Sequence, residues 1–229
     1  TLTTIDESPL KFGLLYVGTD DGNVHISKDG GYTWTNISKK LPQGLWVSRV
    51  TASKYKEGRV FVTLNGYRYD HFLPYLFVSD DYGNTWKPLG KDLPFEPLNV
   101  VREDPKYDSV LYVGSDGGLY VSIDAGNSFS MWGNGLPKSV PVHDIAIQVR
   151  ENEIVLGTHG RSIYVSKLDD VQKLMKDVSY RTEKQAEADR AMAVIQGLTF
   201  NELFKREGIE VECPPSATAQ KGKKDKKGK

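Results

Sequence analysis

Three aspartates recur in one local pattern. Asp29, Asp81 and Asp124 each lie two residues after a serine and two residues before a glycine. Repeated carboxylates could act as general acids or bases, or bind a metal ion. An aspartate near a glycine can instead accept hydrogen bonds from the backbone of a tight turn. Because each copy is expected in a different structural unit, the three carboxylates should not converge, and we interpret them as turn-holding groups.

The whole motif reads Ser-x-Asp-x-Gly-x-Thr/Ser followed by an aromatic residue. We expect the glycine to adopt the positive φ that the turn needs, and the aromatic ring to pack beneath the turn. The structural positions are Ser27, Asp29, Gly31 and Trp34, then Ser79, Asp81, Gly83 and Trp86, then Ser122, Asp124, Gly126 and Phe129.

Binding chemistry is concentrated in residues 65–74, the longest of four expected connections between second and third strands. The other three are residues 19–23, 115–118 and 158–162, and all four should gather on the face opposite the motif turns. Aromatic rings beside Arg, Asp and His suit a sugar ring or a peptide. The alternative is that these aromatics cover a neighbouring part of the protein. The candidate ligand-binding residues are Tyr67, Arg68, Tyr69, Asp70, His71, His159 and Arg161.

His143 and His159 could form a metal pair, but no third ligand follows at a zinc-site spacing. An imidazole hydrogen-bonded to a neighbouring loop is the favoured interpretation. Arg161 could hold a carboxylate or phosphate, and an ion pair with Asp144 or Glu153 is favoured over that. The sequence therefore predicts no metal site, no cofactor and no catalytic residue.

The motif belongs to a larger repeat. Its serines are spaced by 52 and 43 residues, and Leu-Pro follows seven residues after each terminal aromatic. Such periods indicate a repeat architecture. Each block is expected to hold four short strands, and a fourth block, from residue 140, holds three. The expected strands are 2–5, 14–18, 24–27 and 33–37; 47–52, 60–64, 75–79 and 85–89; 98–102, 110–114, 119–122 and 128–132; and 143–149, 154–157 and 163–166.

Four short antiparallel strands per repeat are typical of a β-propeller blade. The predicted fold is all-β, with three complete blades and one partial blade over residues 1–168. A propeller closes with about four to eight blades, so we expect part of a larger ring. The chain begins with Thr1 rather than Met, and we expect the remaining blades on upstream sequence or another chain. Residues 169–206 are predicted to form a helical extension, and residues 207–229 a disordered Pro- and Lys/Gly-rich tail.

Charge and cysteine content limit the possible functions. The formal net charge is +0, with six Lys against one Asp in residues 221–229. A nucleic-acid-binding protein usually carries basic residues across its folded body, so no nucleic-acid partner is expected. The single cysteine, Cys213, excludes an intrachain disulfide but leaves the compartment open. No apolar run is long enough for a transmembrane helix.

The repeated motif resembles the Asp-box, or BNR repeat, of sialidases, sortilin-type receptors, xyloglucanase-type glycosidases and a photosystem assembly factor. The flanking segments 15–22, 141–144 and 157–164 look most like the C-terminal part of large secreted bacterial proteins with sortilin-like propellers, often labelled glycosyl hydrolases. The resemblance covers residues 1–168. It implies a secreted, periplasmic or cell-surface protein, with a membrane-associated assembly left open. The hydrolase label is an analogy of fold and needs a site to support it.

The sequence leaves two functions open. The leading hypothesis is a non-catalytic binding or scaffold propeller of a secreted or cell-envelope protein, which engages protein, peptide or glycan; a sortilin-like peptide receptor is a weaker version. The alternative is a glycoside hydrolase that shares its carboxylates with missing blades. Asp20, Asp21, Asp70 and Asp116 lie in the relevant loops, although a loop-capping role is favoured for them. Arg49, Arg68, Arg102 and Arg161 are not spaced as the arginine triad of a sialidase.

Overall fold

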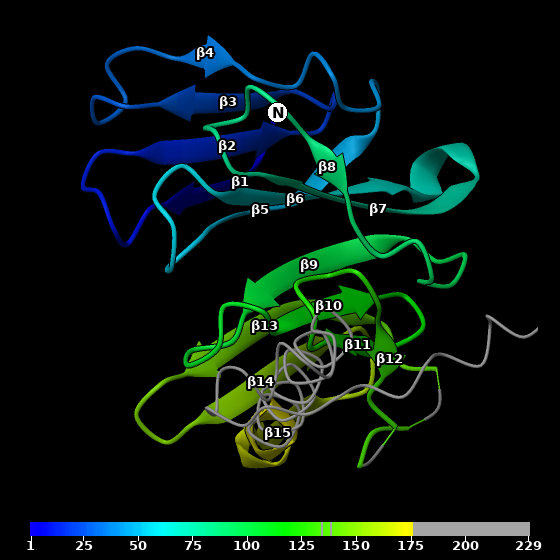
Figure 1. Ribbon diagram of the computed structural model, residues 1–229. Coiled ribbons are helices and arrows are strands. Elements are labelled where there is room, and N and C mark those ends of the chain that lie inside the picture. Colours follow the sequence, from blue (N-terminus) through cyan, green and yellow to red (C-terminus); the bar gives the residue numbers. More distant parts are fainter. Residues whose placement is uncertain (134, 138, 176–229) are drawn as a thin grey trace, which may run out of the picture. The chain divides into compact units, whose positions relative to one another are not determined.

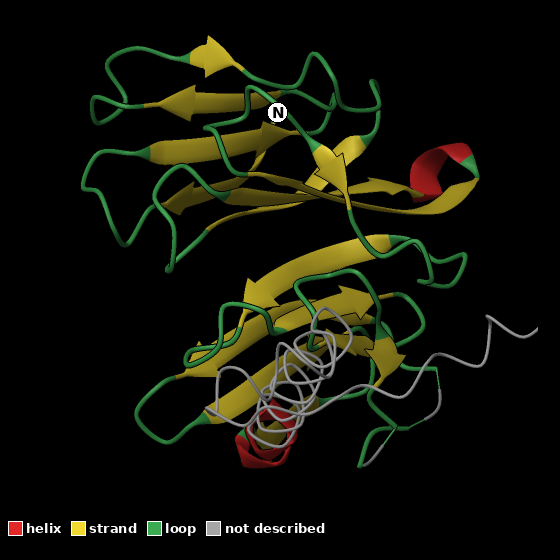
Figure 2. Cartoon of the chain, in the orientation of Figure 1, coloured by secondary structure: helices red, strands yellow, loops and turns green. Residues whose placement is uncertain are grey.

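The computed structural model describes residues 1–133, 135–137 and 139–175. In them, strands form four antiparallel sheets, one for each predicted blade (Figures 1 and 2). Blade 1 holds β1 (Leu2–Glu7), β2 (Leu15–Thr19), β3 (Val24–Ser27) and β4 (Thr35–Asn36). Blade 2 holds β5 (Trp46–Ala52), β6 (Val60–Gly66), β7 (His71–Ser79) and β8 (Lys87–Pro88). Blade 3 holds β9 (Leu98–Glu103), β10 (Leu111–Ser115), β11 (Leu119–Ser122) and β12 (Ser130–Met131), and blade 4 holds β13 (Val142–Gln148), β14 (Glu153–Thr158) and β15 (Ile163–Lys167).

The hydrophobic core lies between successive blades. In β6, Val60 and Val62 pack toward blade 1, whereas Phe61 packs toward blade 3. Neighbouring residues of a strand point to opposite faces, so an unbroken apolar run suits a strand that is covered on both faces. This explains why the central strands read as continuous β-branched and aromatic runs.

Each motif copy forms the same hydrogen-bonded turn, as predicted. In the second copy the Ser79 hydroxyl donates to Asp81 (2.8 Å) and accepts from the Gly83 N–H (2.8 Å). The Asp81 carboxylate also accepts from the Thr85 N–H and hydroxyl, at 2.8 and 2.7 Å. Gly83 has a φ of 84°, a conformation that favours glycine. The equivalent bonds join Ser27, Asp29, Gly31 and Thr33 in the first copy, and Ser122, Asp124, Gly126 and Ser128 in the third.

The first strands of the blades are linked by a repeated polar contact. Each has a register shift near its start, and the residue there donates to a carbonyl of the next blade. Thr3 bonds to Val47 (2.7 Å), Ser48 to Leu98 (2.7 Å) and Asn99 to Val142 (3.2 Å). His143 occupies the corresponding position in blade 4.

Two expectations about strand length need correction. The fourth strands β4, β8 and β12 contain two residues each, fewer than predicted, because motif side chains take the backbone bonds at their start. Residues 65–74 are not a long loop, because β6 runs to Gly66, a 3₁₀ turn covers Tyr67–Tyr69, and β7 begins at His71. Pro74 is tolerated in β7 because β8 pairs only with Val78 and Phe77, which leaves that part of the strand at an edge.

Residues 169–175 are helical, in agreement with the predicted extension. Leu168, Val171 and Met175 are buried in the core of blades 3 and 4. Gln172 donates to Asp104 (3.0 Å) and to Asn152 (3.0 Å) in a buried network. The rest of the predicted extension, residues 176–206, and the predicted tail, residues 207–229, lie outside the described residues. Among the described residues, no helix has the length and hydropathy to cross a membrane.

Candidate functional site

A cavity of about 330 Å³ lies where three blades meet, at the end that carries the connections between second and third strands. We call it the loop-face pocket. Its lining residues come from the starts of β5, β9 and β13 and from the ends of β6, β10 and β14 or the residues just after them. The pocket therefore depends on blades 2, 3 and 4 together. Its lining residues are Trp46, Asn65, Tyr67, Arg68, Asn99, Asp116, Pro141, His143 and His159.

A chain of amide hydrogen bonds forms the floor of the pocket. The Asn65 side-chain amide donates to Asn99 Oδ1 (2.9 Å), and the Asn99 amide donates to Asp116 Oδ1 (2.9 Å). Asn65 and Asn99 are only 6% and 8% exposed. Asn65 Oδ1 also accepts from the N–H of Tyr67 (2.9 Å) and so anchors the 3₁₀ turn. Buried side-chain amides that hydrogen-bond to each other keep one geometry, because a rotation that left one of them without a partner would cost free energy.

Aromatic groups and a cation line the sides. The Arg68 guanidinium stacks over the Trp46 ring, with 4.9 Å from Cζ to the ring centroid, which favours a fixed guanidinium position. The buried Trp46 Nε1 has no hydrogen-bond partner in the described part of the chain. His143 and His159 meet edge to face, with ring centroids 5.2 Å apart. The pocket thus offers a guanidinium, two imidazoles and a carboxylate.

The structure gathers some of the predicted ligand-binding residues and separates the others. Tyr67, Arg68 and His159 line the pocket. Three more do not line it: Tyr69 is 66% exposed, Asp70 ends the 3₁₀ turn with a φ of 54°, and the His71 ring bonds to the Tyr75 hydroxyl (3.0 Å). Arg161 is also exposed and outside the pocket.

Two favoured alternatives of the sequence analysis are wrong. Arg161 does not pair with Asp144 or Glu153, because Arg49 takes Asp144 (2.8 Å) and Lys167 takes Glu153 (2.9 Å). Neither imidazole makes the expected hydrogen bond to a loop within the described residues, and the two rings instead meet edge to face. No cluster of metal-ligating side chains occurs in residues 1–175, positions 134 and 138 aside.

Three important pocket residues were missed from the sequence: Trp46, Asn99 and Pro141. Each lies at or near the start of a first strand, whereas the ligand-binding residues were predicted from the connections between second and third strands. In an antiparallel blade, the start of the first strand and the end of the second share one end. Trp46 and Pro141 lie twelve positions after a motif aromatic and Asn99 lies thirteen, so no residue type recurs at one position to mark the pocket.

The arginines do not converge on the pocket. Arg49 and Arg102 lie on neighbouring first strands, 2.8 and 3.8 Å from the Asp144 carboxylate, and Arg102 also bonds to the Ile145 carbonyl (3.0 Å). Burial, and then the charge of Arg49, lower the pKa of Arg102. Four arginines were candidates, and all lie in the described part of the chain. Of these, Arg68 lines the pocket, whereas Arg49, Arg102 and Arg161 do not.

Solved structures share this fold. A GH74 enzyme of Niastella koreensis aligns with a TM-score of 0.57 and 16% identity over 72% of this chain and 28% of its own. An ancestral GH74 enzyme aligns with a TM-score of 0.58 and 15% identity, over 73% and 24%. YCF48 bound to a D1 peptide aligns with a TM-score of 0.54 and 12% identity, over 73% and 50%.

The fold is that of a β-propeller. This chain spans about a quarter of the length of the GH74 enzymes and half of that of YCF48. No protein-family model matches it, and no curated protein matches it. At sequence identities this low, the structural similarity shows only the fold. The function has to be argued from the residues of the site.

Proposed function

We propose that this chain is a non-catalytic binding propeller whose loop-face pocket holds an extended peptide that carries a carboxylate. The observation that carries the proposal is the Arg68 guanidinium stacked on Trp46 at the side of the pocket. Arg68 supplies the cation for a carboxylate, and the exposed Tyr67 ring beside it supplies an apolar surface for a peptide. The structure of YCF48 with a peptide supports the idea that a propeller of this type can hold such a ligand.

Glycoside hydrolysis is the second candidate, and the GH74 enzymes favour it. Hydrolysis of that kind needs two carboxyl groups on opposite sides of the sugar bond. Among the described residues that line the pocket, Asp116 is the one carboxylate, and it already accepts a hydrogen bond from Asn99. The second carboxyl group would have to come from outside the described residues, which makes binding the better-supported function.

Paired variants test the binding proposal. Tyr67 lines the pocket and Tyr69 does not, although their exposed fractions are similar, 61% and 66%. On an array of acidic peptides and glucan oligosaccharides, we expect Arg68→Ala and Tyr67→Ala to weaken peptide binding by about 1–3 kcal/mol each. Arg161→Ala and Tyr69→Ala are the matched controls and should bind as the wild type does.

Two results would contradict this proposal. Equal losses in the pocket variants and in their controls would place the ligand elsewhere. Turnover of an oligosaccharide by the 229-residue chain that is abolished by Asp116→Asn would establish the hydrolase instead.

The proposal extends to the type of motif, the partners and the location. We infer that the repeated turn is an Asp-box, supported by its three equivalent hydrogen-bond sets. The sortilin-like assignment, the missing blades as partners, and a secreted or cell-envelope location are supported by the sequence resemblance. Fractionation of cells that produce the complete protein tests the location, and recovery in the cytosol alone would contradict it.

A further inference from the structure

The aromatic residues of the second and third motifs are inserted beside the preceding blade. Trp86 packs on the core of blade 1, and its Nε1 donates to the Ile37 carbonyl (2.9 Å). Phe129 packs in the same way on the core of blade 2, against Gly90 and its neighbours. Ile37 and Leu89 are equivalent residues, because their N–H groups bond to the third strand of their own blades at Val24 and Leu76. Blades 2 and 3 therefore each fill a socket on the preceding blade with an aromatic ring.

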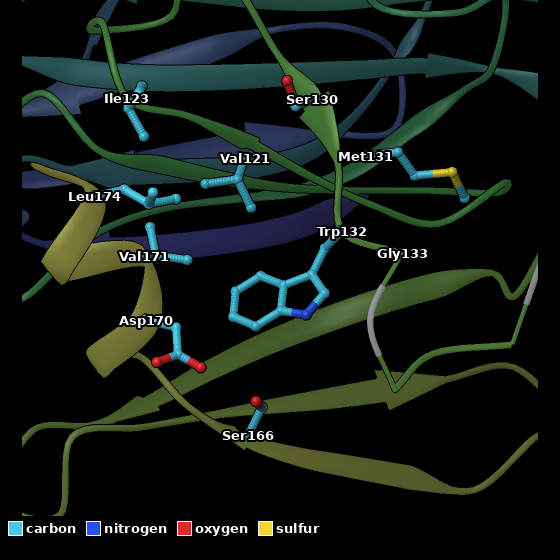
Figure 3. A pocket seen from close by; sticks show the side chains of 10 residues that line it. All are labelled: Val121, Ile123, Ser130, Met131, Trp132, Gly133, Ser166, Asp170, Val171 and Leu174. Atoms are coloured by element: carbon cyan, nitrogen blue, oxygen red, sulfur yellow. The ribbon is translucent and has the colours of Figure 1, made fainter. Parts of the chain in front are cut away.

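A third socket, on blade 3, holds no such ring in the described residues. Trp132 is the equivalent of Ile37 and Leu89, since its N–H bonds to the Leu119 carbonyl (2.8 Å). Val121 is the equivalent of Ile26 and Val78 in the strand pairing. Figure 3 shows these side chains around a cavity of about 340 Å³. The socket is lined by Val121, Ile123, Ser130, Met131, Trp132, Gly133, Ser166, Asp170, Val171 and Leu174.

The reason for the third socket lies in the sequence of blade 4. By strand pairing, Ser166 corresponds to the motif serines, so Leu168 occupies the place of the motif aspartate. The buried Leu168 cannot hold the turn, and residues 169–175 form a helix instead of a fourth strand. Within the described part of the chain, the third strand β15 therefore pairs with β14 alone, and one of its faces is not covered by another blade. Ile163 and Val165 are 67% and 59% exposed, whereas their blade 1 equivalents Val24 and Ile26 are 0% and 4% exposed.

We propose that the socket and the free edge of β15 receive a strand from another blade-forming polypeptide segment, outside residues 1–229, with the pattern aromatic-x-x-apolar. Its aromatic ring enters the socket, the next two residues pair with Val165 and Tyr164, and the N–H of the apolar residue bonds to the Ile163 carbonyl. This register is the one that β4, β8 and β12 adopt in their own blades.

The repeat also determines which element comes after the incoming strand. In blades 1 to 3, a Leu-Pro pair lies in the sequence between the fourth strand and the first strand of the next blade. The next blade is what buries Val24 and its equivalents, so the incoming segment should bring a blade that covers Ile163. Residues 176–229 contain aromatic-x-x-apolar at Phe200 to Leu203 but no Leu-Pro after it, so their sequence lacks the complete pattern of the proposed occupant. This interaction is independent of the loop-face pocket.

The repeat itself supplies a probe. A synthetic peptide of residues 84–103 carries Trp86, Leu89, Leu93-Pro94 and the following first strand. Added to the 229-residue chain, it should slow hydrogen–deuterium exchange of the β15 amides in a saturable manner. The same peptide with Trp86→Ala should lose affinity by about tenfold or more.

Paired variants of the chain locate the socket. Leu174 lines it and is 55% exposed, whereas Leu10 lies outside it and is 47% exposed. Leu174→Asp should reduce peptide binding by about tenfold, and Leu10→Asp, the matched control, should leave binding unchanged. Both positions are exposed, so neither variant should prevent folding.

Three outcomes would overturn the proposal. Absence of β15 protection by the peptide would do so, as would equal binding of the Trp86→Ala peptide. Protection of β15 in the chain alone would identify another occupant. If that protection is independent of concentration, residues 176–229 fill the socket; if it rises together with a dimer in analytical ultracentrifugation, a second copy fills it.

Discussion

Asp29 and Asp81 are held as carboxylates by their own turns. The hydroxyl and N–H of the threonine four residues later, with further hydrogen bonds, lower the pKa of each to about 2. The pKa of Asp124 is lowered in the same direction by the corresponding bonds to Ser128, against the effect of burial. A carboxyl group that ionises this readily cannot act as a general acid near neutral pH. The motif aspartates are thus acceptors within the fold.

These pKa shifts predict an acid-sensitive contribution to stability. Because the pKa is lower in the folded than in the unfolded state, each aspartate stabilises the fold above about pH 4 and loses this effect as the pH falls toward 2. Asp81→Asn should lower Tm at pH 7 and flatten the decline of Tm between pH 5 and pH 2, measured by circular dichroism. Asp70→Asn removes a carboxylate outside the motifs and should keep the wild-type slope. An unchanged slope in Asp81→Asn would contradict this account.

Single residues were predicted from sequence where repetition marked their role. The motif positions Ser79, Asp81 and Gly83 were predicted because three copies show which side chains the turn requires. Trp46 and Asn99 could not be found in that way, because the pocket needs them at different positions in blades 2 and 3. Their roles depend on which blades are adjacent, and this is a property of the tertiary structure.

At the scale of elements, blades 1 and 3 each approach the following blade closely at a glycine of the second strand. A Cβ on Gly18 would lie 2.3 Å from a Val47 methyl group, and one on Gly114 would lie 2.8 Å from the Val142 carbonyl oxygen. Gly157 has the same place in blade 4, yet its Cβ would meet only Asp144 of its own blade, at 3.6 Å. The contrast reflects the presence or absence of a following blade among the described residues.

This contrast predicts opposite outcomes for one substitution. Gly114→Ala should destabilise the protein by about 1–3 kcal/mol, because a backbone oxygen must move to admit the methyl group. Gly157→Ala should cost far less in urea unfolding and serves as the control. Similar losses at both positions would show that blade contact is not the cause.

The strands of each blade were predicted well because apolar runs of four to seven residues lie between turn signals. The lengths of β4, β8 and β12 and the extent of β6 and β7 were not. Side-chain bonds of the motif shorten the fourth strands, and the pairing of Gly66 with His71 extends blade 2 beyond its apolar run. Neither effect has a periodic signal in the sequence.

At the scale of the whole molecule, one ion pair connects blades that are not neighbours in sequence. Arg49 of blade 2 reaches Asp144 of blade 4 past blade 3, and Arg102 of blade 3 lies 3.8 Å from the same carboxylate. A double-mutant cycle with Arg49→Gln and Asp144→Asn should give a coupling energy of about 0.5–1 kcal/mol that falls in 1 M salt. The Asp80→Asn variant, which removes the partner of Arg59 within blade 2, is the control and should show no coupling to Arg49. Zero coupling at low salt would mean that this ion pair does not stabilise the contact between blades 2 and 4.

The hydrogen bonds of Thr3, Ser48 and Asn99 all run in one direction, from each blade to its successor. An interface of this kind has two different sides, so each blade joins its neighbours by the same contact whatever their number. The circumference is then fixed by the angle between blades and not by any one side chain. Duplication of a single blade therefore adds a unit whose interfaces already exist, which is a simple route by which such rings can change size.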